Sequence, residues 1–194
     1  MKRLIYTLAI SGTVLAFQSC SDTSKNSADA SDSTAIAMDS MSPTDTSAMA
    51  VDQMDIDFAN KAAIGGMAEV DFGKLAQEKA VNAKVKDFAN MMVMDHGKAN
   101  GELMAIAGEK NITLPATLDA EHMKKEEELK SKSGADFDKL YVAMMVEGHK
   151  KTLALMQDGS EHCKDSALKG FATKTAPVVK AHLDMITKIQ SELK

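Results

Sequence analysis

Residues 83–110 read AKVKDFANMMVMDHGKANGELMAIAGEK, and this stretch decides the fold. Its apolar residues recur at steps of three and four, which is the spacing of one face of an α-helix. Asn82, just before it, has a side chain suited to a helix N-cap. The apolar face consists of Val85, Ala89, Met92, His96, Ala99, Leu103 and Ile106. The stretch therefore predicts a long amphipathic helix whose buried face includes one imidazole.

The same periodicity predicts three further long helices, over residues 54–81, 135–157 and 166–193, the last with Asp165 as its N-cap. The three apolar faces are Phe58, Ala62, Gly65, Glu69, Phe72 and Ala76; Phe137, Tyr141, Met145, His149, Leu153 and Met156; and Leu168, Phe171, Thr175, Val178, His182, Met185 and Ile189. Residues 118–132 predict a short polar helix between the second and third long helices. No convincing internal repeat is evident.

The connections between these helices favour one all-α architecture. Short links near Asn82 and Asp158–Asp165 predict two antiparallel hairpins. The link between the hairpins has roughly 25 residues, and a helix of 14 residues within it spans about 21 Å. We therefore expect a ferritin-like four-helix bundle with a short extra helix in the crossover. A plain up-and-down bundle with a decorated loop is the alternative.

Composition agrees with this architecture and excludes several classes of protein. The chain has 194 residues, a formal charge of −5, 4% aromatic residues, 15 Met and two Cys. Scarce aromatic residues favour helices over sheets, and two Cys cannot form a disulfide scaffold. An acidic chain without a basic run is a poor nucleic-acid binder. The methionines are most simply core-filling residues, although thioethers beside imidazoles could also favour copper.

The N-terminus predicts export. Lys2 and Arg3 precede an apolar stretch over residues 4–17, and Cys20 stands where cleavage is expected. We therefore expect a lipoprotein signal peptide over 1–19, an acylated Cys20 with a disordered Ser/Thr/Asp/Ala tether over 20–52, and the helical domain over 53–194. The lipid anchor would attach the protein to the bacterial outer membrane. An ordinary secretory signal with a chance Cys is the alternative.

Four polar residues interrupt the apolar faces, one in each long helix: Glu69, His96, His149 and His182. A buried carboxylate or imidazole needs a partner, and one transition-metal ion or a shared hydrogen-bond network would supply it. The sequence does not distinguish Fe, Cu, Zn and Mn. Asp95 and Glu147 are candidates for groups that orient the ligands, or are simply surface residues.

The predicted heights along the bundle support this cluster only in part. Glu69 and His96 lie 13 and 14 residues from Asn82, so we expect them to be level. His149 lies nine residues before the loop, at Asp158, and His182 lies 17 residues after it, at Asp165. The difference of eight residues predicts a height mismatch of about 12 Å between the two histidines. Pro177 would alter that register through a kink. None of the four long helices has the Glu-x-x-His spacing that di-iron bundles require on two helices. This absence argues against di-iron oxidase or ferroxidase chemistry.

Three more residues with chemically active side chains lie outside the four apolar faces. His122, on the short helix, and His162, in the last loop, are expected at the surface. Cys163 is expected to be a lone loop thiol, with a weak metal contact as the alternative.

The motifs Gly65-Gly66-Met67-Ala68-Glu69 and Asp95-His96-Gly97-Lys98-Ala99-Asn100 resemble a bacterial family known as "predicted outer membrane protein". This is domain-of-unknown-function family 4142, which has a ferritin-like domain. Phe137 to Tyr141, Gly148-His149 and Ala181-His182-Leu183 extend the similarity over residues 58–189. The resemblance implies exported helical bundles, often lipid-anchored, with Glu69, His96, His149 and His182 at motif positions. It implies no reaction. Gly148 departs from the Asp or Ala common before the third-helix His.

These observations lead to one expected function and two alternatives. We expect an envelope protein that binds a metal ion in its core for storage, sensing or stress protection. The alternatives are a structural or interaction module whose His–Glu network needs no metal, and a metal-dependent oxidoreductase.

Overall fold

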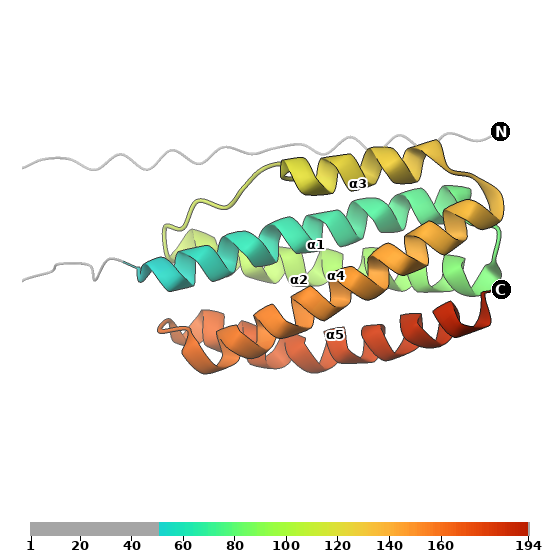
Figure 1. The fold of residues 1–194 in the computed structure, drawn as a ribbon. Helices are drawn as coiled ribbons and strands as arrows, with labels where there is room; N and C mark the ends of the chain where they lie inside the picture. The colour runs from blue at the N-terminus through green and yellow to red at the C-terminus, as the bar shows by residue number, and fades with distance from the viewer. Residues whose placement is uncertain (1–50, 194) are drawn as a thin grey trace, which may run out of the picture. The chain divides into compact units, whose positions relative to one another are not determined.

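The computed structural model describes residues 51–193, which contain five α-helices and no strand (Figure 1). The helices are α1 (Gln53–Lys79), α2 (Ala83–Glu109), α3 (Ala120–Ser131), α4 (Gly134–His162) and α5 (Ser166–Glu192). The prediction of an all-helical fold is confirmed. The predicted signal peptide, Cys20 and the tether up to residue 50 lie outside the described residues.

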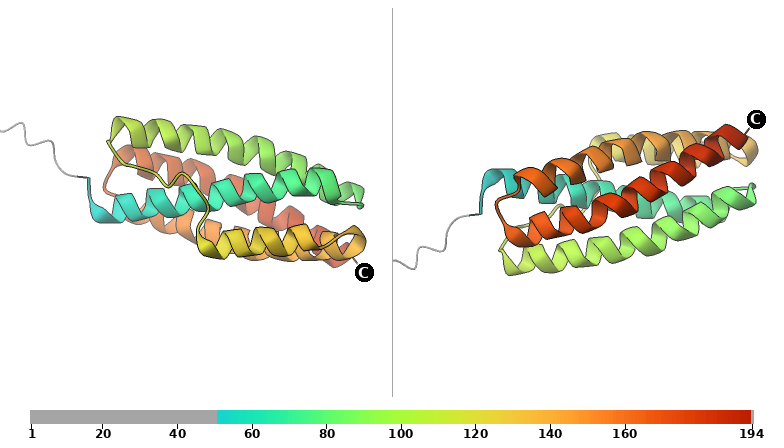
Figure 2. Two further views of the ribbon diagram at one scale, coloured as in Figure 1. Left: turned by 90° about the horizontal axis from the view of Figure 1, so that it is seen from above. Right: turned by 90° about the horizontal axis from the view of Figure 1, so that it is seen from below.

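Four long helices form the bundle, and α3 lies along its side. Helices α1 and α2 form one antiparallel hairpin, and α4 and α5 form the other (Figure 1). Helix α1 packs beside α4, α2 packs beside α5, and α3 contacts α1 and α4 (Figure 2). The segment after α2 and then α3 carry the chain back along the bundle, so α4 begins near the end of α1. Within residues 51–193, no helix is long and apolar enough to span a membrane.

Side chains cap the helices where the sequence predicted. Asn82 Oδ1 accepts hydrogen bonds from the backbone N–H groups of Lys84 (2.9 Å) and Val85 (3.4 Å) at the start of α2. Asp165 Oδ1 accepts from Ala167 (2.9 Å) and Leu168 (3.1 Å) at the start of α5. These bonds satisfy donors that have no partner within the helix.

Two buried aspartates link the two hairpins through hydrogen bonds. The sequence did not single out either of them. Asp55 of α1 accepts hydrogen bonds from the backbone N–H groups of Lys164 and Asp165, both at 2.8 Å, in the loop between α4 and α5. Asp138 of α4 accepts from Val81 at 3.2 Å and Asn82 at 2.8 Å in the loop between α1 and α2.

The two sets of contacts are equivalent and reveal a repeat. Asp138, Lys164 and Asp165 each lie 83 positions after Asp55, Val81 and Asn82, respectively. The hairpins are thus built alike, which corrects the expectation that the chain has no internal repeat. Few other residues coincide at this offset, so the sequence conceals the relation.

Helix α4 extends to His162, five residues beyond the predicted end. Glycine commonly follows the end of a helix. Instead, Gly159 is buried within α4, and any side chain there would overlap the ring of Phe58. The glycine therefore serves close packing between α1 and α4.

The predicted apolar face of α5 was wrong at two positions. Val178 and Met185 are 43% and 44% exposed, whereas Val179 and Ile186 are fully buried. The inward face repeats every seven residues along two rows: Leu168, the half-buried Thr175, His182 and Ile189, and Ala172, Val179 and Ile186. This seven-residue repeat is typical of helices packed side by side in a bundle.

The core consists of two apolar clusters, one toward each end of the bundle. One contains Phe72, Val85, Phe88, Tyr141 and Ile186, among others. The other includes Phe58, Leu103, Met156, Leu168 and Val179. Along α2, α4 and α5, the chain passes from one cluster to the other at the histidine that interrupts the apolar face. Along α1, it does so between Ala63 and Ala68, just before Glu69.

Candidate metal centre

A single polar layer separates the two apolar clusters. It contains Glu69 from α1, His96 from α2, His149 from α4 and His182 from α5, so each long helix contributes one residue. All four are buried, with exposures between 0% and 4%. The structure thus brings together all four residues that the sequence placed on the apolar faces.

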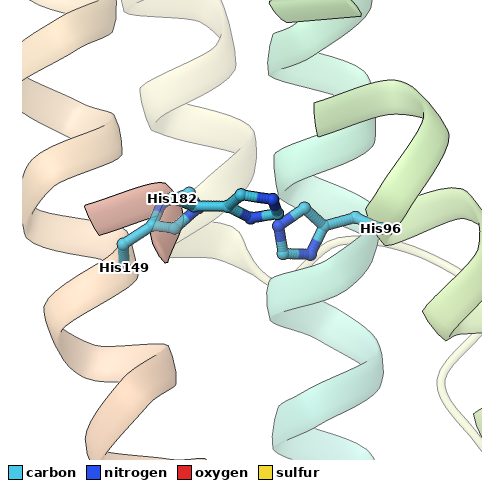
Figure 3. A group of neighbouring side chains, drawn as sticks. All are labelled: His96, His149 and His182. Carbon is cyan, nitrogen blue, oxygen red and sulfur yellow. The ribbon is translucent and has the colours of Figure 1, made fainter. Parts of the chain in front are cut away.

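Three imidazole rings meet at the centre of this layer (Figure 3). The ring centroids of His96, His149 and His182 lie 5.3 to 5.7 Å apart. One nitrogen of each ring lies within 4.8 Å of the other two. The three nitrogens come from three different helices, so a group bound between them would link both hairpins.

The expected mismatch between His149 and His182 is absent. The prediction of about 12 Å assumed that α4 ends at residue 157. Because α4 continues to His162, the loop begins later and His149 lies farther from it along the helix. The two rings are 5.7 Å apart between their centroids. Helix α5 continues through Pro177.

Each ring has one nitrogen fixed by an acceptor. His96 Nδ1 lies 2.7 Å from Glu69 Oε2, and His182 Nε2 lies 3.0 Å from Asp95 Oδ2. His149 Nδ1 lies 2.9 Å from the carbonyl oxygen of Met145, one turn earlier in α4. In a neutral ring, a proton on this nitrogen is donated outward, which leaves the lone pair of the other nitrogen available.

The other nitrogen of each ring is buried without a hydrogen-bond partner. These atoms are His96 Nε2, His149 Nε2 and His182 Nδ1. Buried polar atoms without partners are rare in folded proteins because each costs free energy. Glu69 Oε2 in the same layer also has no hydrogen bond of regular geometry, although it lies 2.7 Å from His96 Nδ1. The three ring nitrogens lie close to one another, so they fit a shared ligand that accepts their lone pairs.

Glu69 supports two of the rings at once. Its Oε1 accepts a hydrogen bond from Thr152 Oγ1 at 3.2 Å and lies 3.7 Å from His149 Nδ1. Burial alone would raise the pKa of Glu69, but His96 and then His149 and Thr152 outweigh burial and lower it. The carboxylate is therefore charged at neutral pH. Thr152 was missed, although it lies only three residues after His149.

The three histidines differ in their preference for a proton. Burial opposes protonation of His96, yet the Glu69 carboxylate outweighs it and raises the pKa of His96. Burial lowers the pKa of His149, and burial together with the neighbouring His96 lowers that of His182. His149 and His182 are thus held neutral, which is the form that binds metals.

The two further candidates from the sequence lie in different places. Asp95 is half-exposed and contacts His182 across the interface between α2 and α5, rather than its sequence neighbour His96. Glu147 lies on the surface, where it pairs with Lys151 at 2.8 Å and Lys125 at 3.6 Å. Asp95 is therefore part of the candidate metal centre, because it contacts His182. Glu147 contacts only surface lysines and is not part of the centre.

Of the two histidines expected at the surface, His162 is exposed, whereas His122 is half-buried and its ring lies 6.5 Å from that of Phe72 between centroids. His162 pairs with Asp158 at 2.9 Å on the surface, and His122 pairs with Asp119 at 2.7 Å. Cys163 is buried in the apolar cluster that contains Phe58, 14 residues after His149 and just beyond the end of α4. Burial, helped by Asp55, raises the pKa of its thiol to about 12. It is therefore a core thiol rather than an exposed loop residue.

The donor set fits a transition-metal ion. Imidazole nitrogens bind Zn, Cu, Fe and Ni. Nitrogens bound to one tetrahedral ion at about 2.0–2.1 Å lie roughly 3.3 Å apart, so the three rings would close by up to about 1.5 Å around it. Three ligands leave a further coordination position, which Glu69 or a small molecule could take.

Comparisons with known proteins agree with a helical fold. A family model described as "Domain of unknown function (DUF4142)" matches residues 40–189. No curated protein matches the sequence.

Two solved structures show a similar fold. A DUF305 fragment from Deinococcus radiodurans superposes with a TM-score of 0.65 at 9% identity, over 73% of this chain and 98% of that one. A DUF305 protein from Streptomyces coelicolor gives a TM-score of 0.62 at 15% identity, over 72% and 92% of the two chains.

Proposed function

The chain belongs to the DUF4142 family, and we propose that its helical bundle binds one transition-metal ion through His96, His149 and His182. Glu69 and Asp95 would act as the acceptors that hold His96 and His182 in the binding orientation. The bound ion would serve storage, sensing or stress protection. Imidazole donors suit Fe, Cu and Zn, and a carboxylate such as that of Glu69 suits Mn.

One observation carries this proposal. Each of three buried rings has one nitrogen engaged outward, while its second nitrogen has no partner. Outward hydrogen bonds to carboxylates or carbonyls are the usual surroundings of metal-binding histidines. A layer that merely specified the packing of four helices would gain nothing from three unsatisfied nitrogens.

We further propose that the bundle is of the ferritin-like kind. The order of its helices supports this, because two antiparallel hairpins are joined by one long crossover that contains α3. Bundles of that kind bind metals through side chains that point inward from facing helices.

We also propose that the protein is an exported lipoprotein, anchored through Cys20 on the bacterial outer membrane. The basic start, the short apolar stretch and the position of Cys20 support this. Replacement of Cys20 by Ala should release the protein from the membrane fraction. Retention of the variant in that fraction would refute the lipid anchor.

Elemental analysis tests the metal site. We expect about one ion per chain after untagged purification or loading with Fe, Cu, Zn or Mn, and less than about a tenth of an ion after His149→Ala. His162→Ala, which changes a surface histidine, is the matched control and should keep the metal. Wild-type protein that holds no ion after all four loadings would rule out the proposal.

A further inference from the structure

A pocket of about 270 Å³ lies between α1, α3 and α4 and reaches the polar layer from outside. The carboxylate of Glu69 and the hydroxyl of Thr152 belong to its lining, together with apolar side chains such as Phe72 and Met145. Glu69 is only 4% exposed and contacts His96 directly. The pocket therefore ends one side chain away from the imidazoles.

Two equivalent glycines create the space. Gly65 of α1 and Gly148 of α4 both line the pocket, and they are 83 positions apart, which is the offset between the two hairpins. A Cβ atom at Gly148 would meet nothing within 4 Å, and one at Gly65 would meet only Thr152 Oγ1 at 3.8 Å. Packing does not require glycine at either position. Both glycines cost helix stability, and their effect is to keep the pocket open.

The outer rim of the pocket is electrically balanced. Lys125 and Lys151 form a network with Glu121 and Glu147, in which the N···O distances run from 2.8 to 3.6 Å. Lys61 and Asp119 also line the pocket and have opposite signs, and Asp119 lies 2.7 Å from Nδ1 of His122, another lining residue. The rim as a whole therefore neither attracts nor repels an ion strongly.

The inner end is different because its charged lining group is the Glu69 carboxylate. A cation that enters an apolar pocket loses hydration, and a carboxylate at the inner end offsets that loss. The volume suffices for an ion with about six waters, which at roughly 30 Å³ each occupy about 180 Å³.

We propose that this pocket is the entry route of the metal ion, with Glu69 as the group that transfers it from the pocket to His96, His149 and His182. The inference rests on the proposed metal site. Helix α3 forms the outer wall of the route, and the two glycines keep it open. Entry and exit would then share one passage.

Plugging the passage tests the inference. Gly148→Leu and, independently, Gly65→Leu would each place a side chain in the pocket without altering a ligand. Gly170→Leu is the matched control, because Gly170 is an exposed helical glycine on α5 with nothing near its added Cβ. The uptake of Co²⁺ by the metal-free protein is followed by stopped-flow absorbance, and its release by transfer to a chelator.

We expect both plugged variants to take up and release Co²⁺ at least about tenfold more slowly than wild type, with stoichiometry and Kd unchanged, because a blocked passage raises one barrier for both directions. Gly170→Leu should behave as wild type. Wild-type rates in either well-folded plugged variant, or a raised Kd with faster release, would overturn the entry route while leaving the metal site intact. Failure of wild type to bind Co²⁺ at all would instead count against the proposed site.

Discussion

At the scale of single residues, Glu69 determines how well the three imidazoles are prepared for an ion. It is the carboxylate nearest to two of the rings, at 2.7 Å from His96 and 3.7 Å from His149. Its negative charge makes the imidazole of His96 a stronger donor and fixes the position of its proton. The charge and the hydrogen-bonding geometry can be separated, because glutamine has the same shape without the charge.

Glu69→Gln should therefore weaken metal binding by about 10- to 100-fold, the usual loss for a group that supports a metal ligand. Competition titration with a chromophoric chelator measures the change in Kd. Glu147→Gln is the control, because Glu147 has the same chemistry but contacts only lysines on the surface. Equal affinities for the two variants would mean that Glu69 has no role in the site.

The residues of the polar layer could be predicted from the sequence, but their contacts could not. Glu69, His96, His149 and His182 each interrupt an apolar face, so their burial follows from helical periodicity. The pairing of Asp95 with His182 depends on how α2 lies against α5, which no spacing within one helix encodes. The carbonyl of Met145 is a backbone group that no residue type reveals.

At the scale of elements, each hairpin loop is fastened by an aspartate of the other hairpin. Asp138 accepts hydrogen bonds from two backbone N–H groups that begin the turn into α2. Without the carboxylate, these partly buried donors lose their partners, and each unsatisfied donor costs about 1–3 kcal/mol.

Asp138→Ala should therefore lower the free energy of unfolding by about 2–6 kcal/mol. Urea denaturation followed by circular dichroism measures this loss. Asp136→Ala changes an exposed aspartate of the same helical turn and should cost much less. Equal losses in the two variants would show that the link from α4 to the first hairpin contributes nothing to stability.

The N-cap of α5 gives the fold a dependence on pH. Burial alone would raise the pKa of Asp165, but Lys110 and the backbone N–H groups of Leu168 and Ala167 outweigh it and lower the pKa. A lowered pKa means that the unfolded chain takes up this proton first. Asp165 thus stabilises the fold above the usual aspartate pKa of about 3.9, and this contribution is lost as the pH falls through the folded value.

The difference in stability between wild type and Asp165→Asn should therefore be constant near neutral pH and shrink below about pH 4. Urea titrations at several pH values measure it. If the stability difference between wild type and Asp165→Asn grew on acidification, the lowered pKa of Asp165 would be contradicted.

The element boundaries show where sequence patterns succeed and where they fail. The starts of α2 and α5 were predicted correctly, because Asn82 and Asp165 act locally as caps. The end of α4 was not, because Gly159 is required by the ring of Phe58 from another helix. Local capping is encoded in neighbouring residues, whereas close packing depends on a partner far away in sequence.

At the scale of the whole molecule, the polar layer joins the two hairpins at the middle of the bundle. His96 belongs to the first hairpin, and His149 and His182 belong to the second. Apolar clusters on both sides hold the rings in place, so an ion bound by all three would cross-link the hairpins through the core. Such an ion binds the folded chain and not the unfolded one, which has no assembled site.

Metal binding should therefore raise the thermal stability of the whole bundle. At a free metal concentration of 100 times Kd, the gain is about 2.7 kcal/mol. For a domain of this size, each kcal/mol shifts Tm by about 2–4 °C, so Tm should rise by about 5–11 °C. Differential scanning calorimetry with and without the ion measures the shift, and a chelator should reverse it. His182→Ala should abolish it, and His162→Ala should retain it. The same shift in His182→Ala as in wild type would mean that the ion stabilises the protein from some other place.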